Sequence, residues 1–220
     1  MNRNGYNTSY RKSLKDKILA TAIKLFNERG VKSVKMDDIS NSLSISKRTL
    51  YEIYENKEDL LFECVKTSIE KGEKELHDSV EKADNVMDIL IRIFRLKIEL
   101  LQKTHPSFYT ELQKYPKILD YFKQQDAHRQ TQQMEFIQRG INEGYFRTDV
   151  NYRLILDLFD VSNRHVITNY SSLHSSMEIV SYNLIFVFLR GFCTMKGIDI
   201  LDRFLQEDPM MQTFRKNLSN

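Results

Sequence analysis

The sequence contains few residues that form turns or cross-links: seven glycines, three prolines and two cysteines among 220 residues. So few glycines and prolines leave little room for the turns of an all-β architecture, and we expect an all-α fold. Cys64 and Cys193 lie far apart within periodic apolar segments. This placement favours buried free thiols over a disulfide and is consistent with a reducing cytoplasm.

Long apolar runs are also missing. The first ten residues lack the apolar core of a signal peptide, and the longest apolar run covers only residues 184–189. A membrane-spanning helix needs about 18 apolar residues. We therefore expect no membrane insertion and a cytoplasmic location.

The common signatures of enzymes are absent from the sequence. It has no His-Glu-x-x-His motif, no glycine-rich phosphate loop and no Gly-x-Ser-x-Gly elbow, and no pair of histidines stands at metal-ligand spacing. We therefore predict a protein that is not an enzyme and that needs no cofactor or metal.

Positive charge is concentrated near the N-terminus. Residues 1–57 carry 12 Lys and Arg against 6 Asp and Glu, a net of +6, whereas residues 58–220 carry 21 against 24, a net of −3. Neutralising phosphates is the sequence-independent part of nucleic-acid affinity, so this asymmetry predicts a polyanion-binding surface in the first quarter of the chain. A solvated basic face is the alternative.

The spacing of apolar residues predicts helices along the whole chain. Residues 1–12 are polar and are expected to form a flexible arm, after which a helix capped by Ser13 runs as far as Gly30. A short helix is expected to begin near Met36, and Ser46 can cap a third. Further helices are predicted from Asn56 to about residue 80, over residues 86–104, 106–114, 116–143, 151–169 and 177–192, and after Gly197.

The third predicted helix has two different faces. Helical geometry places Lys47, Arg48, Tyr51 and Glu52 on one side and the apolar Leu50 on the other. Two short helices joined by a tight turn, with a basic and polar face on the second, match the helix-turn-helix design. In that design the second helix enters the major groove of DNA.

Five stretches of the region around these helices resemble TetR-family transcriptional regulators, over about residues 13–62. They are Gly30, Asp38-Ile39-Ser40, Ile45-Ser46-Lys47-Arg48-Thr49-Leu50-Tyr51, Tyr54, and Asn56-Lys57-Glu58-Asp59-Leu60-Leu61. The resemblance implies a helix-turn-helix DNA-binding domain at residues 13–57 and a helical effector-binding and dimerisation domain at residues 58–220. It also implies a repressor that binds a palindromic operator as a homodimer and is released by a small apolar or aromatic effector.

Six residues are expected to contact double-stranded DNA. In the family, the residues that match Lys47, Arg48 and Tyr51 face the groove, and those that match Thr49 and Lys57 touch phosphates. The sixth is Lys35, whose cationic side chain can reach a phosphate from the start of the second helix.

Four positions depart from the family pattern. Lys35 stands in place of a capping Ser or Thr, Asp37 in place of a base-reading cation, Ser44 in place of a turn glycine and Ile53 in place of a phosphate-binding His. These departures leave the operator sequence open without affecting the expected fold.

The helix predicted at residues 177–192 is apolar almost all round, so it must be buried on several sides. We expect it to pack with the helix at residues 151–169, and with the same two helices of a second copy, into a four-helix seam of a homodimer. Burial inside one subunit is the alternative.

Aromatic side chains and histidines of the larger domain are candidates for binding a small-molecule effector. They are Phe94, His105, Phe108, Tyr109, Tyr121, Phe122, Phe159 and His165, with His128 as a further polar candidate. The same aromatic residues would serve equally as hydrophobic core. A second functional reading is a helical adaptor that keeps this fold but binds protein instead of DNA, suggested by the acidic Glu52 and Glu55 beside the third helix.

Overall fold

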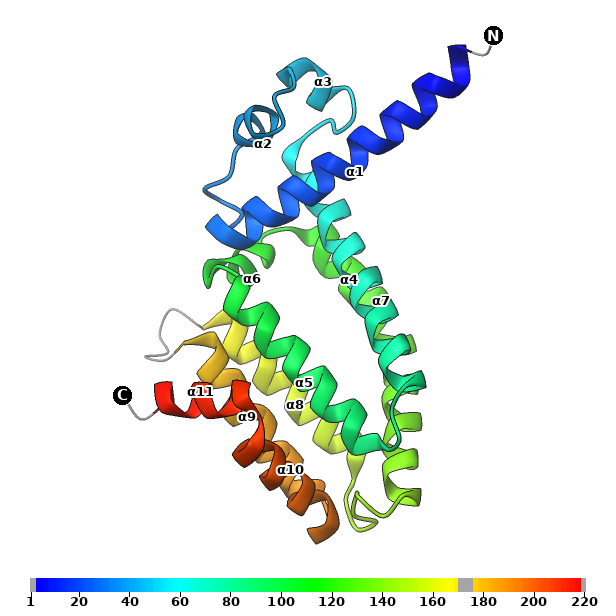
Figure 1. The fold of residues 1–220 in the computed structure, drawn as a ribbon, viewed down its shortest axis with the longest axis vertical. Helices are drawn as coiled ribbons and strands as arrows, with labels where there is room; N and C mark the ends of the chain where they lie inside the picture. Colours follow the sequence, from blue (N-terminus) through cyan, green and yellow to red (C-terminus); the bar gives the residue numbers. More distant parts are fainter. Residues whose placement is uncertain (1–2, 170–175, 219–220) are drawn as a thin grey trace. The chain divides into compact units, whose positions relative to one another are not determined.

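The computed structural model describes residues 3–169 and 176–218, which form eleven α-helices (Figure 1). Within these residues the only strand-like pairing is one isolated bridge between Phe146 and Cys193. The all-α prediction is confirmed. The helices are α1 (Arg3–Arg29), α2 (Met36–Ser42), α3 (Lys47–Tyr51), α4 (Lys57–Glu81), α5 (Val86–Lys103), α6 (Ser107–Leu112), α7 (Pro116–Asn142), α8 (Tyr152–Thr168), α9 (Met177–Phe192), α10 (Met195–Glu207) and α11 (Pro209–Leu218).

The N-terminal helix is longer than the sequence predicted. α1 begins at Arg3, so the flexible arm expected at residues 1–12 is wrong for residues 3–12. That stretch contains no proline and only one glycine, Gly5, and each residue added to an existing helix contributes one more backbone hydrogen bond. Ser13 therefore lies inside the helix and does not cap it.

Three helices begin where the sequence predicted, and each begins with a capping side chain. Ser46, Asn56 and Asn151 each accept a hydrogen bond from the backbone amide three residues later, at 3.0, 2.9 and 3.2 Å. Such bonds satisfy amides that have no partner within the helix. α9 coincides with the predicted range Met177–Phe192, whereas α11 was not predicted.

The chain folds as two compact units. The first combines residues 3–74 with residues 103–121. Its core is formed by residues that are at most 1% exposed, among them Ile18 and Phe26 of α1, Ile39 of α2, Leu50 of α3 and Leu60 of α4. These side chains fix α2 and α3 against α1, which is the support that a recognition helix needs.

α6 belongs to this first unit and lies against the end of α1. The amide of His105 donates to the carbonyl oxygen of Asn27 at 2.5 Å, and the amide of Lys32 donates to the Glu111 carboxylate at 2.7 Å. Gly30, with φ +78, leaves room there, since a Cβ would lie 2.6 Å from Oγ of Ser107. The glycine seen in the sequence at this position is therefore required by close packing as well as by backbone conformation.

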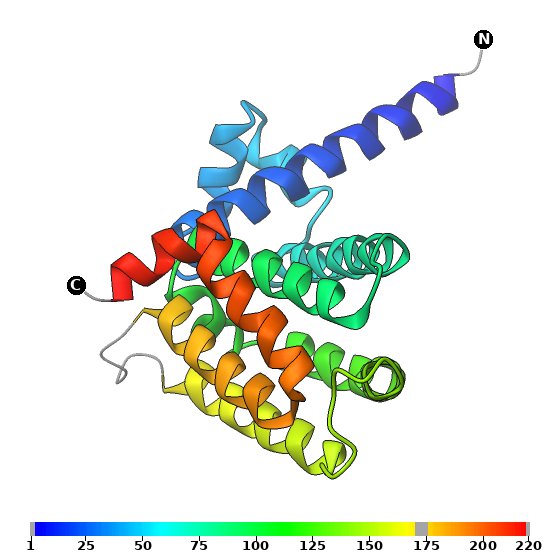
Figure 2. The same ribbon diagram turned by 60° about the horizontal axis from the view of Figure 1, so that its bottom comes forward.

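The second unit contains residues 75–102 and the described residues from 122 onward. Its α8 and α9 lie side by side in both views (Figures 1 and 2). α7 ends at Asn142 and is followed by Gly144, with φ +77. There the amide of Tyr145 donates to the carbonyl of Gly140 at 2.9 Å, and that of Gly144 donates to the carbonyl of Ile141 at 3.0 Å. This is the glycine C-cap that the sequence predicted.

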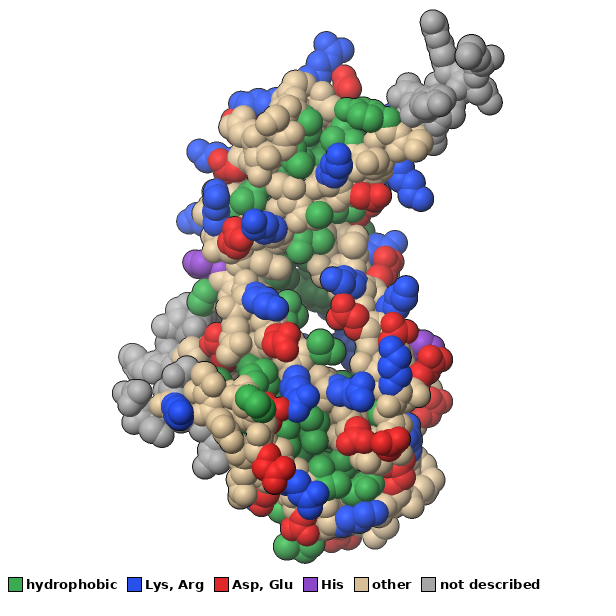
Figure 3. All heavy atoms as spheres, viewed as in Figure 1, with side chains coloured by type: hydrophobic (Ala, Val, Ile, Leu, Met, Phe, Trp, Pro, Cys, Tyr) green, Lys and Arg blue, Asp and Glu red, His purple; other side chains and the backbone are tan. Residues whose placement is uncertain are grey.

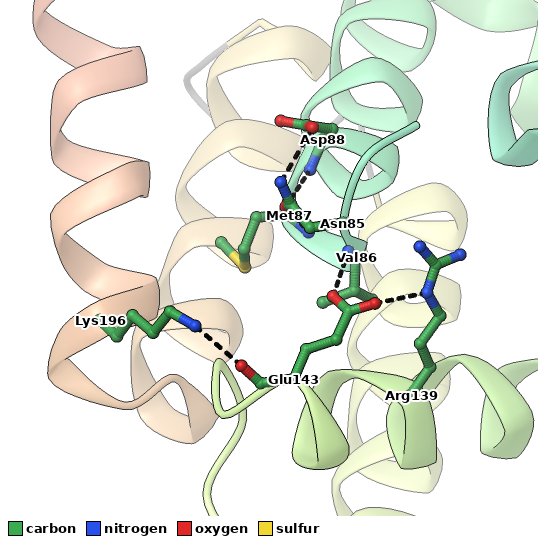
Figure 4. A network of polar contacts seen from close by, with 7 residues as sticks. All are labelled: Asn85, Val86, Met87, Asp88, Arg139, Glu143 and Lys196. Atoms are coloured by element: carbon green, nitrogen blue, oxygen red, sulfur yellow. Dashed lines mark hydrogen bonds and ion pairs between the residues drawn. The ribbon is translucent and has the colours of Figure 1, made fainter. Parts of the chain in front are cut away.

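A polar network joins three helices of the second unit (Figure 4). The Glu143 carboxylate accepts hydrogen bonds from the amide of Val86 at 2.7 Å and from Nε of Arg139 at 2.6 Å, and Lys196 donates to the Glu143 carbonyl at 2.9 Å. Partial burial opposes ionisation of Glu143, but the bonds from Val86 and Arg139 outweigh it and hold its pKa below the usual value. The network fixes the start of α5 and the start of α10 to the end of α7.

Both cysteines are free and buried, as predicted. Among the residues that the structure describes, no helix combines the length and the apolar character needed to cross a bilayer.

Candidate nucleic-acid interface

α3 carries the exposed polar face that the sequence predicted. Leu50 is fully buried, whereas Tyr51 keeps 48% of its surface exposed and the side chains of Lys47 and Arg48 are exposed. Figure 3 shows Lys and Arg side chains along the edge of the part that contains α1 to α3. A short, well-supported helix with this face is suited to enter a major groove.

Each basic group on α3 has a carboxylate partner. Nζ of Lys47 lies 2.5 Å from Oδ2 of Asp37 on α2, and Nε of Arg48 lies 3.0 Å from Oε1 of Glu52, one turn further along. The hydrogen bond to Asp37 raises the pKa of Lys47, which keeps its ammonium charged. DNA must therefore compete with two intramolecular carboxylates for these cations.

The turn between α2 and α3 has the conformation that a glycine would adopt freely. Ser44 has φ +53, in the left-handed region, and its amide donates to the carbonyl of Asn41 at 3.1 Å. The serine found in place of the usual glycine thus preserves the turn at a cost in backbone strain.

Two expected phosphate contacts lie at helix starts. Thr49 is in the first turn of α3, where its hydroxyl is 2.8 Å from that of the capping Ser46. Lys35 is exposed immediately before α2, and its backbone amide donates to the Asp38 carboxylate at 2.7 Å. Asp38 thereby replaces part of the cap that Lys35 cannot provide.

Lys57 is placed differently from the other DNA-binding candidates. Its ammonium donates to the carbonyl oxygen of Val31 and lies 5.9 Å from the centre of the Phe26 ring. Burial lowers the pKa of Lys57, although the negative charges of Glu111 and Asp38 act in the opposite direction. The side chain joins the start of α4 to the segment after α1, so in this structure it is engaged inside the first unit.

Comparison with known proteins relates this part of the chain to a family of regulators. The model described as "Bacterial regulatory proteins, tetR family" matches residues 18–64. The chain is 26% identical over 161 residues to the HTH-type transcriptional repressor KstR2 of Mycobacterium tuberculosis, covering 69% of this chain and 80% of that protein. Residues 18–64 therefore match the N-terminal domain of the tetR family. The proteins matched in these comparisons are transcriptional regulators.

A second relative and two solved structures are also similar to this chain. The biofilm operon icaADBC HTH-type negative transcriptional regulator IcaR of Staphylococcus epidermidis is 49% identical over 47 residues, which are 21% of this chain and 25% of IcaR. The solved structure of a TetR-family regulator from Agrobacterium tumefaciens, 15% identical, superposes with a TM-score of 0.67 over 84% of this chain and all of the other. A putative regulator from Saccharomonospora viridis in complex with choline, 21% identical, gives 0.63 over 83% of this chain and 99% of the other.

Four of the candidate effector residues lie in the first unit, near α6 and the start of α7. His105 Nδ1 is 3.0 Å from the Ser107 hydroxyl at the start of α6, and the Phe108 and Tyr109 rings meet edge to face at 5.4 Å. Tyr121 meets the ring of Phe62 on α4 at 5.6 Å. These contacts give each residue a packing or capping role.

The other four candidates lie in the second unit, and the structure does not bring them into one cluster. Phe94 is in the core, 5.1 Å from the Phe186 ring. His165 is exposed beside Asn169, Phe122 is partly buried, and Phe159 packs edge to face on Phe188 of α9 at 5.3 Å. The side chain of His128 lies outside the described part of the chain.

Two grooves of about 450 Å³ lie in the second unit, one among α5, α10 and α11 and the other between α9 and α10. Neither is lined by any of the candidate effector residues. Sequence patterns identified the residues that α3 exposes because local helix geometry determines them. They could not identify the partners of the aromatic rings, because those partners come from other helices.

Proposed function

We propose that the protein is a repressor that binds a palindromic operator as a homodimer and releases it when a small effector binds. The exposed face of α3, with Lys47, Arg48 and Tyr51, is the observation that carries the proposal. The relatives KstR2 and IcaR are a repressor and a negative regulator, which supports the direction of control. Residues 13–57 would bind DNA and residues 58–220 would bind the effector and the second copy.

Within the interface, Lys47, Arg48 and Tyr51 would contact base edges, and Lys35, Thr49 and the start of α4 at Lys57 would hold phosphates. Arg and Lys donate to guanine, and a Tyr ring can contact the methyl group of thymine. Helix starts attract phosphates because their amides have no partner within the helix.

A binding assay on DNA that flanks the protein's own gene tests this function. We expect binding in the nanomolar range that weakens steeply as salt rises, because each phosphate contact releases counterions. Replacing Lys35 by Ala should weaken binding to all sequences alike and reduce the salt slope by about one. Equal affinity for this DNA and for scrambled DNA would contradict the proposal and would favour an adaptor that binds protein.

Dimerisation is supported by apolar side chains left exposed on α8 and α9. Leu154, Leu158 and Val161 are 53%, 47% and 63% exposed, and Val187 of α9 is 71% exposed. The spacing of four and three residues places the three α8 side chains on one side of the helix. Exposed apolar side chains gathered on one side of a helix are typical of protein interfaces, and a second copy would cover them through the same two helices.

The dimer is tested by measuring the mass of the protein in solution at micromolar concentration. Leu158→Glu should shift the protein to monomer, because it places a carboxylate within an apolar contact. Arg153→Glu introduces the same group on another side of α8, where Arg153 is exposed, and should leave the dimer intact. A wild type that runs as a folded monomer would exclude the dimer.

Effector release would act through the distance between the two recognition helices. Half-sites in successive major grooves are about 34 Å apart, so a dimer binds tightly only when its two α3 helices keep that separation. α4 runs without interruption from Lys57, beside the helix-turn-helix, to Glu81 in the second unit. An effector that prefers one arrangement by about 1–3 kcal/mol would change operator affinity about 5- to 150-fold.

A further inference from the structure

One side of α5 is apolar and accessible, with a single cation in its middle. Ile93, Leu96 and Leu100 keep 38%, 40% and 51% of their surface exposed. Lys97 lies four residues after the first, one after the second and three before the third. Spacings of three and four residues place Ile93, Lys97 and Leu100 on one side of the helix, and Leu96 stands three after Ile93 and four before Leu100, so it borders the same side.

Lys97 has no counter-ion in the part of the chain that the structure describes. Its ammonium forms no ion pair and no hydrogen bond among the described residues, and Nζ lies 5.7 Å from the centre of the Phe159 ring on α8. Burial lowers the pKa of Lys97, which shows that the surroundings disfavour the charged form. A contact with one aromatic ring offsets only part of the cost of removing an ammonium from water.

Aromatic rings of α8 and α9 lie near the ammonium of Lys97. Phe159 meets Phe188 of α9 edge to face, with ring centres 5.3 Å apart and planes at 84°. Lys97 therefore lies between an aliphatic stripe on α5 and an aromatic pair from α8 and α9. This is an apolar surface that holds one uncompensated positive charge.

We infer that this side of α5 binds a small apolar molecule that carries a single carboxylate, with Lys97 as its counter-ion. One cation matches one negative charge, whereas a phosphate dianion would leave a surplus charge in an apolar environment. The aliphatic stripe of Ile93, Leu96 and Leu100 would hold the apolar body. The inference rests on the proposed function, in which a small molecule releases the operator, and it specifies the class of that molecule.

Calorimetric titration with two matched probes tests the inference on the full chain. Dodecanoate carries one carboxylate, and dodecan-1-ol has the same chain without a charge. Wild type should bind dodecanoate about tenfold or more tightly than Lys97→Met does, because the charge-assisted contact is lost. Lys97→Arg should keep most of the affinity, and Lys82→Met, which removes an exposed lysine, should bind like wild type.

Dodecan-1-ol measures the contribution of the apolar surface to binding without the contribution of the carboxylate charge. It should bind wild type and Lys97→Met alike, and Lys97→Met should melt no lower than wild type, because methionine fills similar space without a charge to desolvate. Dodecanoate binding that is equal in wild type and Lys97→Met, or absent in wild type, would overturn the inference. A melting temperature of Lys97→Met clearly below that of wild type would also overturn it, since it would give the cation a structural role.

Measuring DNA binding in the absence of dodecanoate distinguishes failure of the carboxylate site from failure of the proposed repressor function. If the wild type binds DNA flanking its own gene but Lys97→Met does not change the affinity for dodecanoate, the carboxylate site is refuted and the proposed repressor function is not. Dodecanoate bound through Lys97 should in turn lower the affinity of wild type for that DNA more than the affinity of Lys97→Met.

Discussion

Replacing Gly140 by Ala should destabilise the protein, although alanine is the better helix former. A Cβ at this position in α7 would lie 2.1 Å from Cδ2 and 2.3 Å from Cε2 of Phe146, where 3.4–4 Å is an ordinary contact. Phe146 is 1% exposed, and its ring centre is 5.9 Å from that of Phe136 and 5.1 Å from that of Phe192. The ring therefore cannot move away without displacing both neighbours.

The expected loss is about 2 kcal/mol. Forcing an extra methyl into a packed core costs about 1–3 kcal/mol, and a displacement of more than 1 Å places this case at the upper end. Alanine recovers about 1 kcal/mol because it is a better helix former than glycine. For a chain of this size the difference corresponds to a melting temperature about 4–8 °C lower.

Gly72 provides the matched control. It also lies inside a helix, α4, but a Cβ there would meet nothing within 4 Å. Gly72→Ala should therefore raise stability by about 0.5–1 kcal/mol. Urea denaturation followed by circular dichroism measures both changes. A Gly140→Ala variant as stable as wild type would show that Phe146 does not pack against α7 as described.

Three further predictions concern single positions. Ser44→Gly should stabilise the protein by about 1 kcal/mol in the same assay, because it relieves a φ of +53, and a loss of stability would contradict that conformation. Burial raises the pKa of Cys64 and of Cys193 to about 12, so neither thiol should react with a disulfide reagent at pH 8 until the protein unfolds; fast reaction in the native state would be inconsistent with their burial. Asp37→Asn should tighten binding to all DNA sequences by up to about fivefold, because it frees Lys47 from its ion pair, and weaker binding measured by anisotropy would show that Asp37 contributes to the interface.

Local patterns predicted most of the helices because their determinants lie close together in sequence. Ser46, Asn56 and Asn151 each cap a helix through an amide three residues away, and Gly144 follows the end of α7 in a left-handed conformation. The exposed face of α3 follows from the same local geometry. The start of α1 was missed because Ser13 resembles a cap, yet nothing before it stops the helix.

Contacts between distant segments could not be predicted from the sequence. The Lys57 ammonium binds the carbonyl oxygen of Val31, 26 positions away, and Lys47 pairs with Asp37 across the turn. Nor does the sequence of α5 show that Phe94 is core while Lys97, three residues later, faces Phe159. Such pairings depend on how whole helices pack, and each helix offers several sides to its neighbours.

The claim that α3 reads DNA sequence is tested most directly by one ratio, the affinity for DNA flanking the protein's own gene divided by the affinity for scrambled DNA of equal length. At a fixed salt concentration, wild type should give a ratio of about 10³ or more. Arg48→Ala should lower the affinity for the flanking DNA by about 1–3 kcal/mol and reduce affinity for scrambled DNA much less, so the ratio should fall. An unchanged ratio in Arg48→Ala would show that this side of α3 is not the reading surface.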